Sequence, residues 1–177
     1  MSEMVNERGY FQIYTGNGKG KTTAALGLVL RAAGAGKMVL FTQFLKTKTF
    51  SEHKALECFS DLIAIHCFGT GDFIRGEVRP EHREAAQRGY AMLCALMEHH
   101  RFSVVVCDEI ITALNLGLLT KEQVLVLSDR CVRTGEVVFT GRCAPEYLIE
   151  HADLVTEMVE VKHYYSAGVV ARRGIEY

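Results

Sequence analysis

The feature that most restricts the fold of this chain is a glycine-rich turn between an apolar strand and a helix. Residues 10–30 read "YFQIYTGNGKGKTTAALGLVL", with Gly16, Gly18 and Gly20 in the turn and Lys21 directly after it. Backbone N–H groups in such a turn, together with the positive end of the following helix, attract anions. Glycine permits positive φ and lets a ligand approach the backbone closely. The turn therefore predicts a phosphate-binding loop.

Two side chains after the turn have defined uses at a nucleotide. The Lys21 ammonium can reach the outer phosphates, and the Thr22 hydroxyl suits Mg²⁺. The spacing departs from the usual pattern, because three residues and not four separate Gly16 from the Gly-Lys pair. Either Thr15 takes the first loop position or the loop is one residue shorter. Lys19 adds a second cation inside the loop.

Short apolar runs alternate along the chain with longer helical patterns. We expect strands at residues 10–14, 37–44, 62–67, 102–107, 136–140 and 154–161. We expect helices near residues 21–33, 51–59, 80–100, 120–131 and 144–151. Runs such as "VVVC" are apolar throughout, as in strands that are covered on both faces. The chain is therefore predicted to be α/β: a single, doubly wound, mostly parallel β-sheet with helices on both faces, like a P-loop NTPase.

The length and composition exclude several classes of protein. At 177 residues, we expect residues 1–177 to form one domain with a substantial core. A formal net charge of −1 gives no overall attraction to nucleic acid or to an anionic membrane. No apolar stretch reaches transmembrane length, and the opening "MSEMVNERGY" is unlike a signal peptide. We therefore expect a cytoplasmic protein with neither nucleic acid nor membrane as a partner.

A second part of the predicted site follows two later strands. The segment "FSVVVCDEIITALNLGLL" places Asp108 and Glu109 at the end of a buried strand, where a carboxylate can hold a metal directly or through water. In "VVFTGR", Arg142 follows another strand. Ligands of open α/β sheets gather at such strand ends. From the residues alone, Arg142 is an equally good surface arginine, and the pattern indicates a nucleoside triphosphate with Mg²⁺ and no more.

Several segments together resemble the ATP:corrinoid adenosyltransferases of the P-loop type, which act in cobalamin synthesis and salvage. These are "TGNGKGKTTAALGLVLRAAGAGK", "QFLK", "VVVCDEI", "TGR" and "VKHYYSAGVVARRGIEY", and the likeness covers residues 12–177. The resemblance implies transfer of the 5′-deoxyadenosyl group of ATP to the Co(I) of a reduced corrinoid (cobalamin or a precursor), with release of triphosphate. It implies that ATP lies in the loop in reverse sense to most P-loop enzymes. It also implies a homodimer and an electron-donating reductase, a flavoprotein.

The resemblance assigns roles to residues of this chain. It implies ATP contacts at Gly16, Asn17, Gly18, Lys19, Gly20, Lys21, Thr22, Thr23 and Arg31. Thr22 and Glu109 would hold Mg²⁺ or Mn²⁺, and Lys21, Glu109 and Arg142 would be the catalytic residues. Since Co(I) is itself a strong nucleophile, the reaction needs cations to assist a departing triphosphate and no activated side-chain nucleophile.

The corrinoid site is where this chain departs from the family pattern. Relatives carry Phe and Trp in the loop after "TG", and the family is thought to use aromatic side chains to displace the lower axial ligand of cobalt. This chain has no tryptophan and reads "GDFIR" at residues 71–75. Phe73, with Ile74 behind it, is the remaining candidate to contact the corrinoid. An anchor that holds a long loop on the core is an equally good interpretation of Phe73.

Two other functions fit the same residues. A small-molecule P-loop kinase or ATPase would cleave at the γ-phosphate, yield ADP and could use Asp108 as a base. A non-catalytic, ATP-dependent corrinoid-binding module would keep the phosphate loop without transfer. The product distinguishes them, because only an adenosyltransferase releases triphosphate.

Overall fold

The computed structural model describes residues 8–47, 50–71, 74 and 76–177. It contains a six-stranded sheet in the order β3-β2-β4-β5-β1-β6, and all of its neighbouring strands pair in parallel. The strands are β1 (Phe11–Thr15), β2 (Val39–Phe44), β3 (Ile63–Phe68), β4 (Val104–Asp108), β5 (Glu136–Thr140) and β6 (Leu154–Glu157). The α-helices are α1 (Lys21–Gly34), α2 (Ser51–Leu56), α3 (Pro80–His99), α4 (Ile110–Asn115), α5 (Lys121–Val132) and α6 (Glu146–His151). Two short 3-10 helices are η1 (Glu57–Phe59) and η2 (Tyr164–Ala167).

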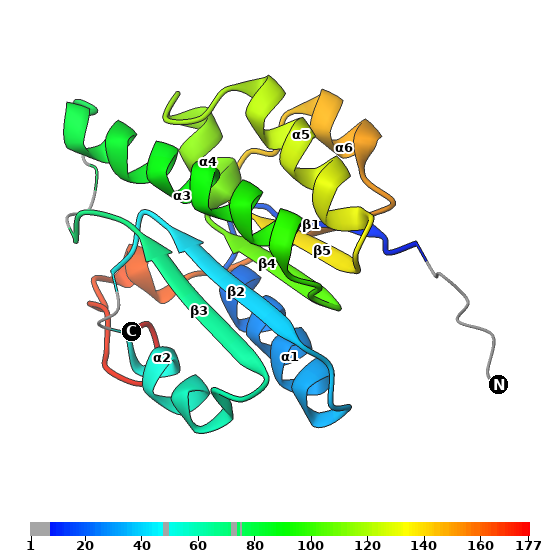
Figure 1. The fold of residues 1–177 in the computed structure, drawn as a ribbon. Coiled ribbons are helices and arrows are strands. Elements are labelled where there is room, and N and C mark those ends of the chain that lie inside the picture. The colour runs from blue at the N-terminus through cyan, green and yellow to red at the C-terminus, as the bar shows by residue number, and fades with distance from the viewer. Residues whose placement is uncertain (1–7, 48–49, 72–73, 75) are drawn as a thin grey trace, which may run out of the picture.

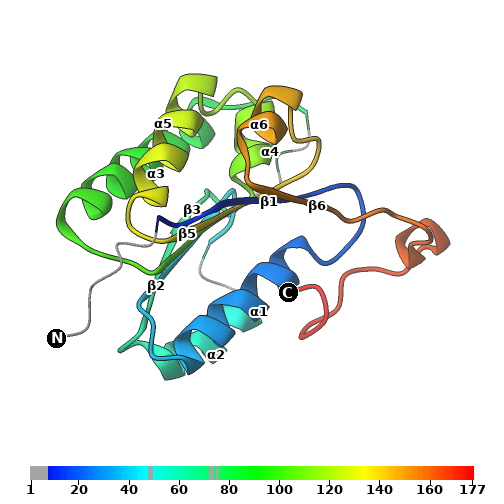
Figure 2. The ribbon, with the colours of Figure 1, turned by 90° about the vertical axis from the view of Figure 1, so that its right-hand side faces the viewer.

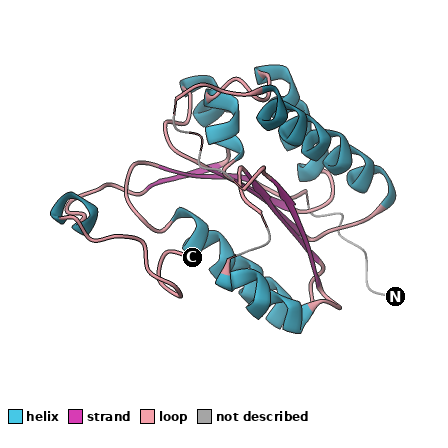
Figure 3. Ribbon diagram, turned by 90° about the vertical axis from the view of Figure 1, so that its left-hand side faces the viewer, coloured by secondary structure: helices cyan, strands magenta, loops and turns pink. Residues whose placement is uncertain are grey.

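Helices cover the sheet on both faces. The helices α1 and α2 lie on one face, and α3, α4, α5 and α6 lie on the other (Figure 1). The view along the sheet shows the same three layers, with the segment after β6 extending beyond the sheet and returning toward α1 (Figure 2). Figure 3 shows the strands between the two helical layers from the opposite side. The prediction of a doubly wound α/β sheet is confirmed.

Side chains of each central strand alternate between two cores. In β2, Leu40 and Phe44 belong to the core under α3, α5 and α6, whereas Val39 and Phe41 belong to the core under α1 and α2. All four side chains are fully buried. Burial on both faces explains why the strand sequences are apolar throughout and show no polar alternation.

The structure differs from the predicted elements at two places that bear on the site. The sequence did not predict α4, because a six-residue helix is too short to show a helical period. The last strand ends at Glu157 and not at residue 161. Met158 N–H still donates to the Thr15 carbonyl at 2.8 Å, but the Met158 carbonyl accepts from Gly18 N–H at 2.7 Å, so the chain leaves the sheet toward the glycine-rich loop.

None of the helices among the described residues is both long and apolar enough to cross a bilayer.

Two helical glycines allow a matched test of the packing between α3 and the sheet. A Cβ on Gly89 would lie 2.5 Å from Cγ of Phe68, whose ring packs on Phe44 at a centroid distance of 5.4 Å. Replacement of Gly89 by Ala is expected to lower the free energy of unfolding by about 1–3 kcal/mol, because the core must shift. A Cβ on Gly27 in α1 would meet nothing within 4 Å. Gly27→Ala is therefore expected to raise the free energy of unfolding by up to about 1 kcal/mol. Urea denaturation of both variants measures the difference, and changes of the same sign would contradict this packing.

Candidate functional site

The glycine-rich loop lies at the carboxyl end of β1 and leads directly into α1. Thr15 is the last residue of β1, and its Oγ1 accepts a hydrogen bond from Ala144 N–H at 3.2 Å. Because Thr15 belongs to the strand, the loop consists of residues 16–20 and is one residue shorter than the usual pattern. Gly16 and Gly20 have φ of 95° and 124°, in the region that favours glycine.

Two loop glycines make room for the backbone of the chain itself. A Cβ on Gly16 would lie 2.4 Å from the Met158 carbonyl oxygen, and one on Gly18 would lie 2.7 Å from it. The segment after β6 thus packs directly against the loop. From the sequence, we expected glycine here because a phosphate must come close to the backbone and because parts of such a loop adopt positive φ. The structure adds a third reason, which is the close approach of the Met158 backbone.

Lys21 spans the loop from the first turn of α1. Its Nζ donates to the carbonyls of Gly16 at 2.7 Å and Gly18 at 2.8 Å, and the residue is 7% exposed. Burial lowers the pKa of Lys21, and the Arg142 charge lowers it further. The carboxylates of Glu109 and Asp108 act in the opposite direction. The ammonium is thus partly desolvated and bonded only to neutral carbonyls, so an anion in the loop would be a stronger partner.

Asp108, at the end of β4, is the centre of a buried polar cluster beneath the loop. Its carboxylate is 0% exposed. It accepts hydrogen bonds from Thr22 Oγ1 at 2.9 Å, Gln43 Nε2 at 2.9 Å, Lys46 Nζ at 3.0 Å and Thr140 Oγ1 at 2.6 Å. The donors come from α1, from β2 and the residues after it, and from β5. A single carboxylate therefore fixes the Thr22 hydroxyl relative to the sheet.

Sequence reasoning missed the contributions of Gln43 and Lys46. The two residues belong to the "QFLK" motif, and Gln43 pairs with Asp108 in the register of β2 and β4. Burial alone would lower the pKa of Lys46, but the adjacent Asp108 carboxylate, helped by Glu109, raises it overall. The Gln43 side chain also contacts His53 of α2, which is 3% exposed. The signal in the sequence was a polar pair at the end of a buried strand.

Glu109 faces the cavity that Asp108 does not reach. It adopts φ of 60°, which is uncommon for a residue other than glycine, and its N–H donates to Thr140 Oγ1 at 2.9 Å. Its Oε2 accepts from Thr112 Oγ1 at 2.5 Å. The Thr22 hydroxyl and the Glu109 carboxylate are hard oxygen ligands, which suit Mg²⁺ when phosphate oxygens complete its coordination shell. Among the described residues, no group of three His, Cys, Asp or Glu side chains could hold an ion alone.

Most of the predicted nucleotide contacts line one cavity of about 660 Å³. Its lining residues are Asn17, Gly18, Lys19, Gly20, Lys21, Thr22, Thr23, Leu26, Lys46, Ser51, Glu52, Ala55, Glu109, Arg142, His163, Gly174, Ile175, Glu176 and Tyr177. The volume is typical of a small-molecule site. Its walls come from the loop with the start of α1, from α2, from the tail after β6, and from Lys46, Glu109 and Arg142 beyond the ends of β2, β4 and β5.

Arg142 lies at this cavity, and Asn115 Nδ2 donates to its carbonyl at 2.9 Å. Arg31 lies elsewhere, exposed in the last turn of α1, where its charge opposes the rise that burial causes in the pKa of Tyr14. Ile74 is half-buried and packs against the core under α3. Phe73 lies outside the described residues. The structure therefore groups the predicted phosphate and metal residues and leaves Arg31 and Ile74 apart from them.

Comparisons with known proteins agree with this geometry. The profile of the family described as ATP:corrinoid adenosyltransferase BtuR/CobO/CobP matches residues 7–177. A corrinoid adenosyltransferase of Pseudomonas aeruginosa is 35% identical over all of this chain and 88% of its own length. A corrinoid adenosyltransferase of Escherichia coli is 32% identical over all of this chain and 90% of its own length. The flagellar accessory protein FlaH of Methanocaldococcus jannaschii superposes with a TM-score of 0.56 over 85% of this chain and 71% of that one, at 14% identity, and shares the fold alone.

The buried carboxylate beneath the loop should dominate the stability of this region. Asp108→Asn leaves the Lys46 ammonium without its counter-charge, so we expect the free energy of unfolding to fall by about 3–5 kcal/mol. The control is Asp129→Asn, because the Asp129 side chain is 59% exposed and pairs with His151 at 3.0 Å. That variant should lose less than about 1 kcal/mol. Equal losses in urea denaturation would contradict the role of Asp108.

Proposed function

This chain belongs to the ATP:corrinoid adenosyltransferase family, and from that membership we propose the reaction that its site performs. It transfers the 5′-deoxyadenosyl group of ATP to the Co(I) centre of a corrinoid and releases triphosphate, in the synthesis or salvage of adenosylcobalamin. The observation that carries this function is the family match over residues 7–177, which includes the phosphate loop and the strand ends around one cavity of about 660 Å³.

The residues of the cavity suit a displacement with a polyanionic leaving group. The Co–C bond forms as the bond between C5′ and the triphosphate oxygen breaks, and that oxygen keeps the electron pair. We propose that Lys21, Arg142 and the loop N–H groups other than that of Gly18, which is bonded to the backbone after β6, bind the triphosphate and stabilise the charge that develops on it. Asn17 and Thr23 line the same cavity and complete the phosphate contacts. The chain's contribution is to place C5′ in line with the cobalt.

We also propose that Thr22 and Glu109 hold Mg²⁺ or Mn²⁺ bound to the phosphates. Such an ion neutralises charge on the leaving triphosphate. Asp108 would act through Thr22, since its carboxylate lies beneath the cavity and fixes the Thr22 hydroxyl at 2.9 Å. The carboxylate that faces the cavity is that of Glu109.

The burial of Asp108 weighs against the kinase alternative. A kinase needs a base beside its acceptor, and Asp108 was the candidate. Its carboxylate is 0% exposed and is occupied by four hydrogen-bond donors. It is therefore unable to reach an acceptor in the cavity.

Further aspects of the function are proposed from the family pattern. Residues 1–177 form a single adenosyltransferase domain that acts in the cytoplasm, where ATP is supplied. A flavoprotein reductase donates the electron that reduces the corrinoid substrate. The active form is a homodimer. A surface for self-association is available at the edge strand β6, where Leu154 is 45% and Val155 is 38% exposed.

The function is tested by anaerobic incubation with ATP, Mg²⁺ and chemically reduced cobalamin. The optical spectrum reports the cobalt–carbon bond, and ³¹P NMR identifies the phosphate product. We expect the bond and one triphosphate per turnover. ADP and no cobalt–carbon bond would support a kinase or ATPase, and neither product would support a binding module.

Lys21→Ala is expected to lower the rate of this assay by at least about 100-fold, because a cation that stabilises the leaving group is lost. The matched control is Lys37→Ala, since Lys37 is exposed beyond the end of α1. That control should retain the rate of the unchanged protein. A normal rate in the Lys21→Ala variant would contradict the proposal that the loop stabilises the leaving triphosphate.

Phe73 remains the proposed contact to the corrinoid. Phe73→Ala should slow the reaction when the assay starts from Co(II) with a reductant and leave it nearly unchanged when it starts from Co(I). The reason is that displacement of the lower ligand matters for reduction and not for transfer. Phe59→Ala is the control, because Phe59 is 45% exposed in η1. Equal losses from both starting states would argue against ligand displacement by Phe73.

A further inference from the structure

The tail after β6 forms one wall of the nucleotide cavity. His163 and residues 174–177 line the cavity together with residues of the phosphate loop and α2. The tail also reaches α2 directly, where Ser51 Oγ donates to the Tyr177 carbonyl at 3.0 Å. The position of this wall therefore affects the space in which a nucleotide can lie.

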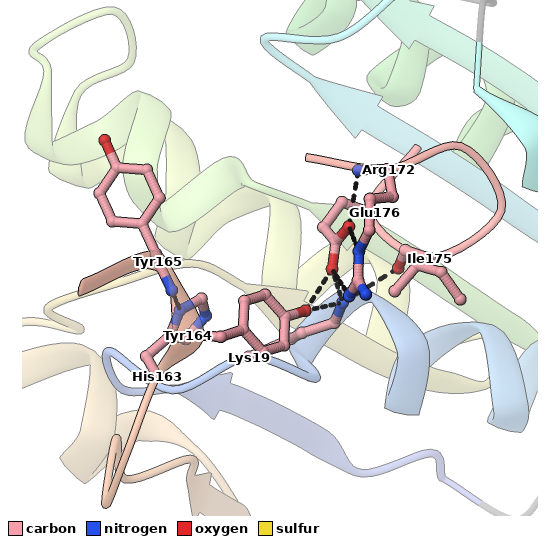
Figure 4. A network of polar contacts seen from close by, with 7 residues as sticks. All are labelled: Lys19, His163, Tyr164, Tyr165, Arg172, Ile175 and Glu176. Carbon is pink, nitrogen blue, oxygen red and sulfur yellow. Dashed lines mark hydrogen bonds and ion pairs between the residues drawn. The ribbon is translucent and has the colours of Figure 1, made fainter. Parts of the chain in front are cut away.

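Lys19 of the phosphate loop and three residues of the tail form a polar network that holds the tail on the loop (Figure 4). We call these residues the tail latch: Lys19, Tyr164, Arg172 and Glu176. The Glu176 carboxylate accepts from Lys19 Nζ at 2.7 Å, from Arg172 N–H at 2.7 Å and from Arg172 Nη2 at 3.3 Å. It also accepts from the Tyr164 hydroxyl. Hydrogen bonds from Arg172, Lys19 and Tyr164 hold the pKa of Glu176 well below its usual range. The carboxylate thus stays charged at neutral pH.

Lys19 uses all of its donors on the tail. An ammonium group has three N–H donors. Lys19 Nζ donates to Glu176 Oε1 at 2.7 Å, to the Tyr164 hydroxyl oxygen at 3.0 Å and to the Ile175 carbonyl at 3.0 Å. No N–H of Lys19 is left for a phosphate in this arrangement. Lys21, in contrast, is bonded only to two loop carbonyls.

The tail has little apolar packing to replace the latch. Val161 is 93%, Tyr165 is 73%, Val170 is 75% and Ile175 is 58% exposed. These side chains contribute little hydrophobic stabilisation, because most of their surface stays in water. The contacts of Met158 fix only the start of the tail. Among the described residues, those that bond the far end, which lines the cavity, to the rest of the domain are Lys19 and Ser51.

We propose that Lys19 is a positioning residue, which holds the tail as a wall of the nucleotide cavity through Glu176 and Tyr164 and makes no contact with the phosphates. The role of Lys21 as the phosphate-binding lysine of the loop is unaffected. This inference rests on the proposed function in one respect, namely that the cavity binds ATP. It replaces the expectation that Lys19 binds ATP directly.

A double-mutant cycle separates the two roles of Lys19. The variants are Lys19→Met, Glu176→Gln and the pair together, and the readouts are the Kd for ATP by calorimetry and kcat with KM for ATP. We expect each single variant to raise the Kd and KM by about fivefold, the double variant to be no worse than either single, and kcat to stay unchanged. The controls Lys162→Met and Glu160→Gln remove the same charges from exposed positions of the tail and should leave the Kd unchanged. A much larger loss for Lys19→Met than for Glu176→Gln, multiplied in the double variant, would show direct phosphate binding and overturn the proposal.

Trypsin provides a readout that needs no nucleotide, because Arg172 and Arg173 are exposed cleavage sites in the tail. Lys19→Met and Glu176→Gln should each raise the rate of cleavage after Arg173 by about fivefold. Intact mass spectrometry measures that rate. Unchanged cleavage in both variants would overturn the latch even if ATP binds. If the unchanged protein binds no ATP, the proposed function fails, and the cleavage rates still decide whether Lys19 holds the tail.

Discussion

The site depends on one buried charge, the Asp108 carboxylate at the carboxyl end of β4. A charge removed from water must be paired and hydrogen-bonded, or the fold loses several kcal/mol. Here the donors come from α1, from β2 and the residue two beyond Phe44, and from β5. The same bonds that satisfy the carboxylate therefore fix the start of α1, and with it the phosphate loop, against the sheet. Glu109, the next residue, is left to face the cavity.

The phosphate loop serves two structural purposes at once. The start of α1 and the loop N–H groups other than that of Gly18 make up the proposed anion site, while Gly16 and Gly18 let the Met158 backbone approach to distances that a side chain would prevent. Gly18 N–H is bonded to the Met158 carbonyl at 2.7 Å. The short loop and the long tail are thus parts of one arrangement, in which residues more than a hundred positions apart line the same cavity.

Local patterns were enough to predict much of this structure from the sequence. The strand, loop and first helix follow from glycine spacing, and Asp108 and Glu109 follow from polar residues at the end of an apolar strand. From the residues alone Arg142 was an equally good surface arginine, and the family resemblance assigned its role. What the sequence did not show depends on contacts between distant parts of the chain. Lys46 reaches Asp108 because β2 lies beside β4, and Lys19 turns to the tail because Glu176, 157 residues later, comes back to the loop. The resemblance implied a nucleotide contact at Arg31; ten residues of helix separate it from Lys21, and it is not among the residues that line the cavity.

We propose that the cationic loop binds the triphosphate and leaves the C5′ carbon of ATP open to attack by cobalt. A crystal structure of the ATP complex tests it most directly. We expect the Lys21 ammonium to move from the loop carbonyls to a phosphate oxygen and C5′ to face the open side of the cavity. A complex with C5′ enclosed by protein and the γ-phosphorus facing the opening would contradict it.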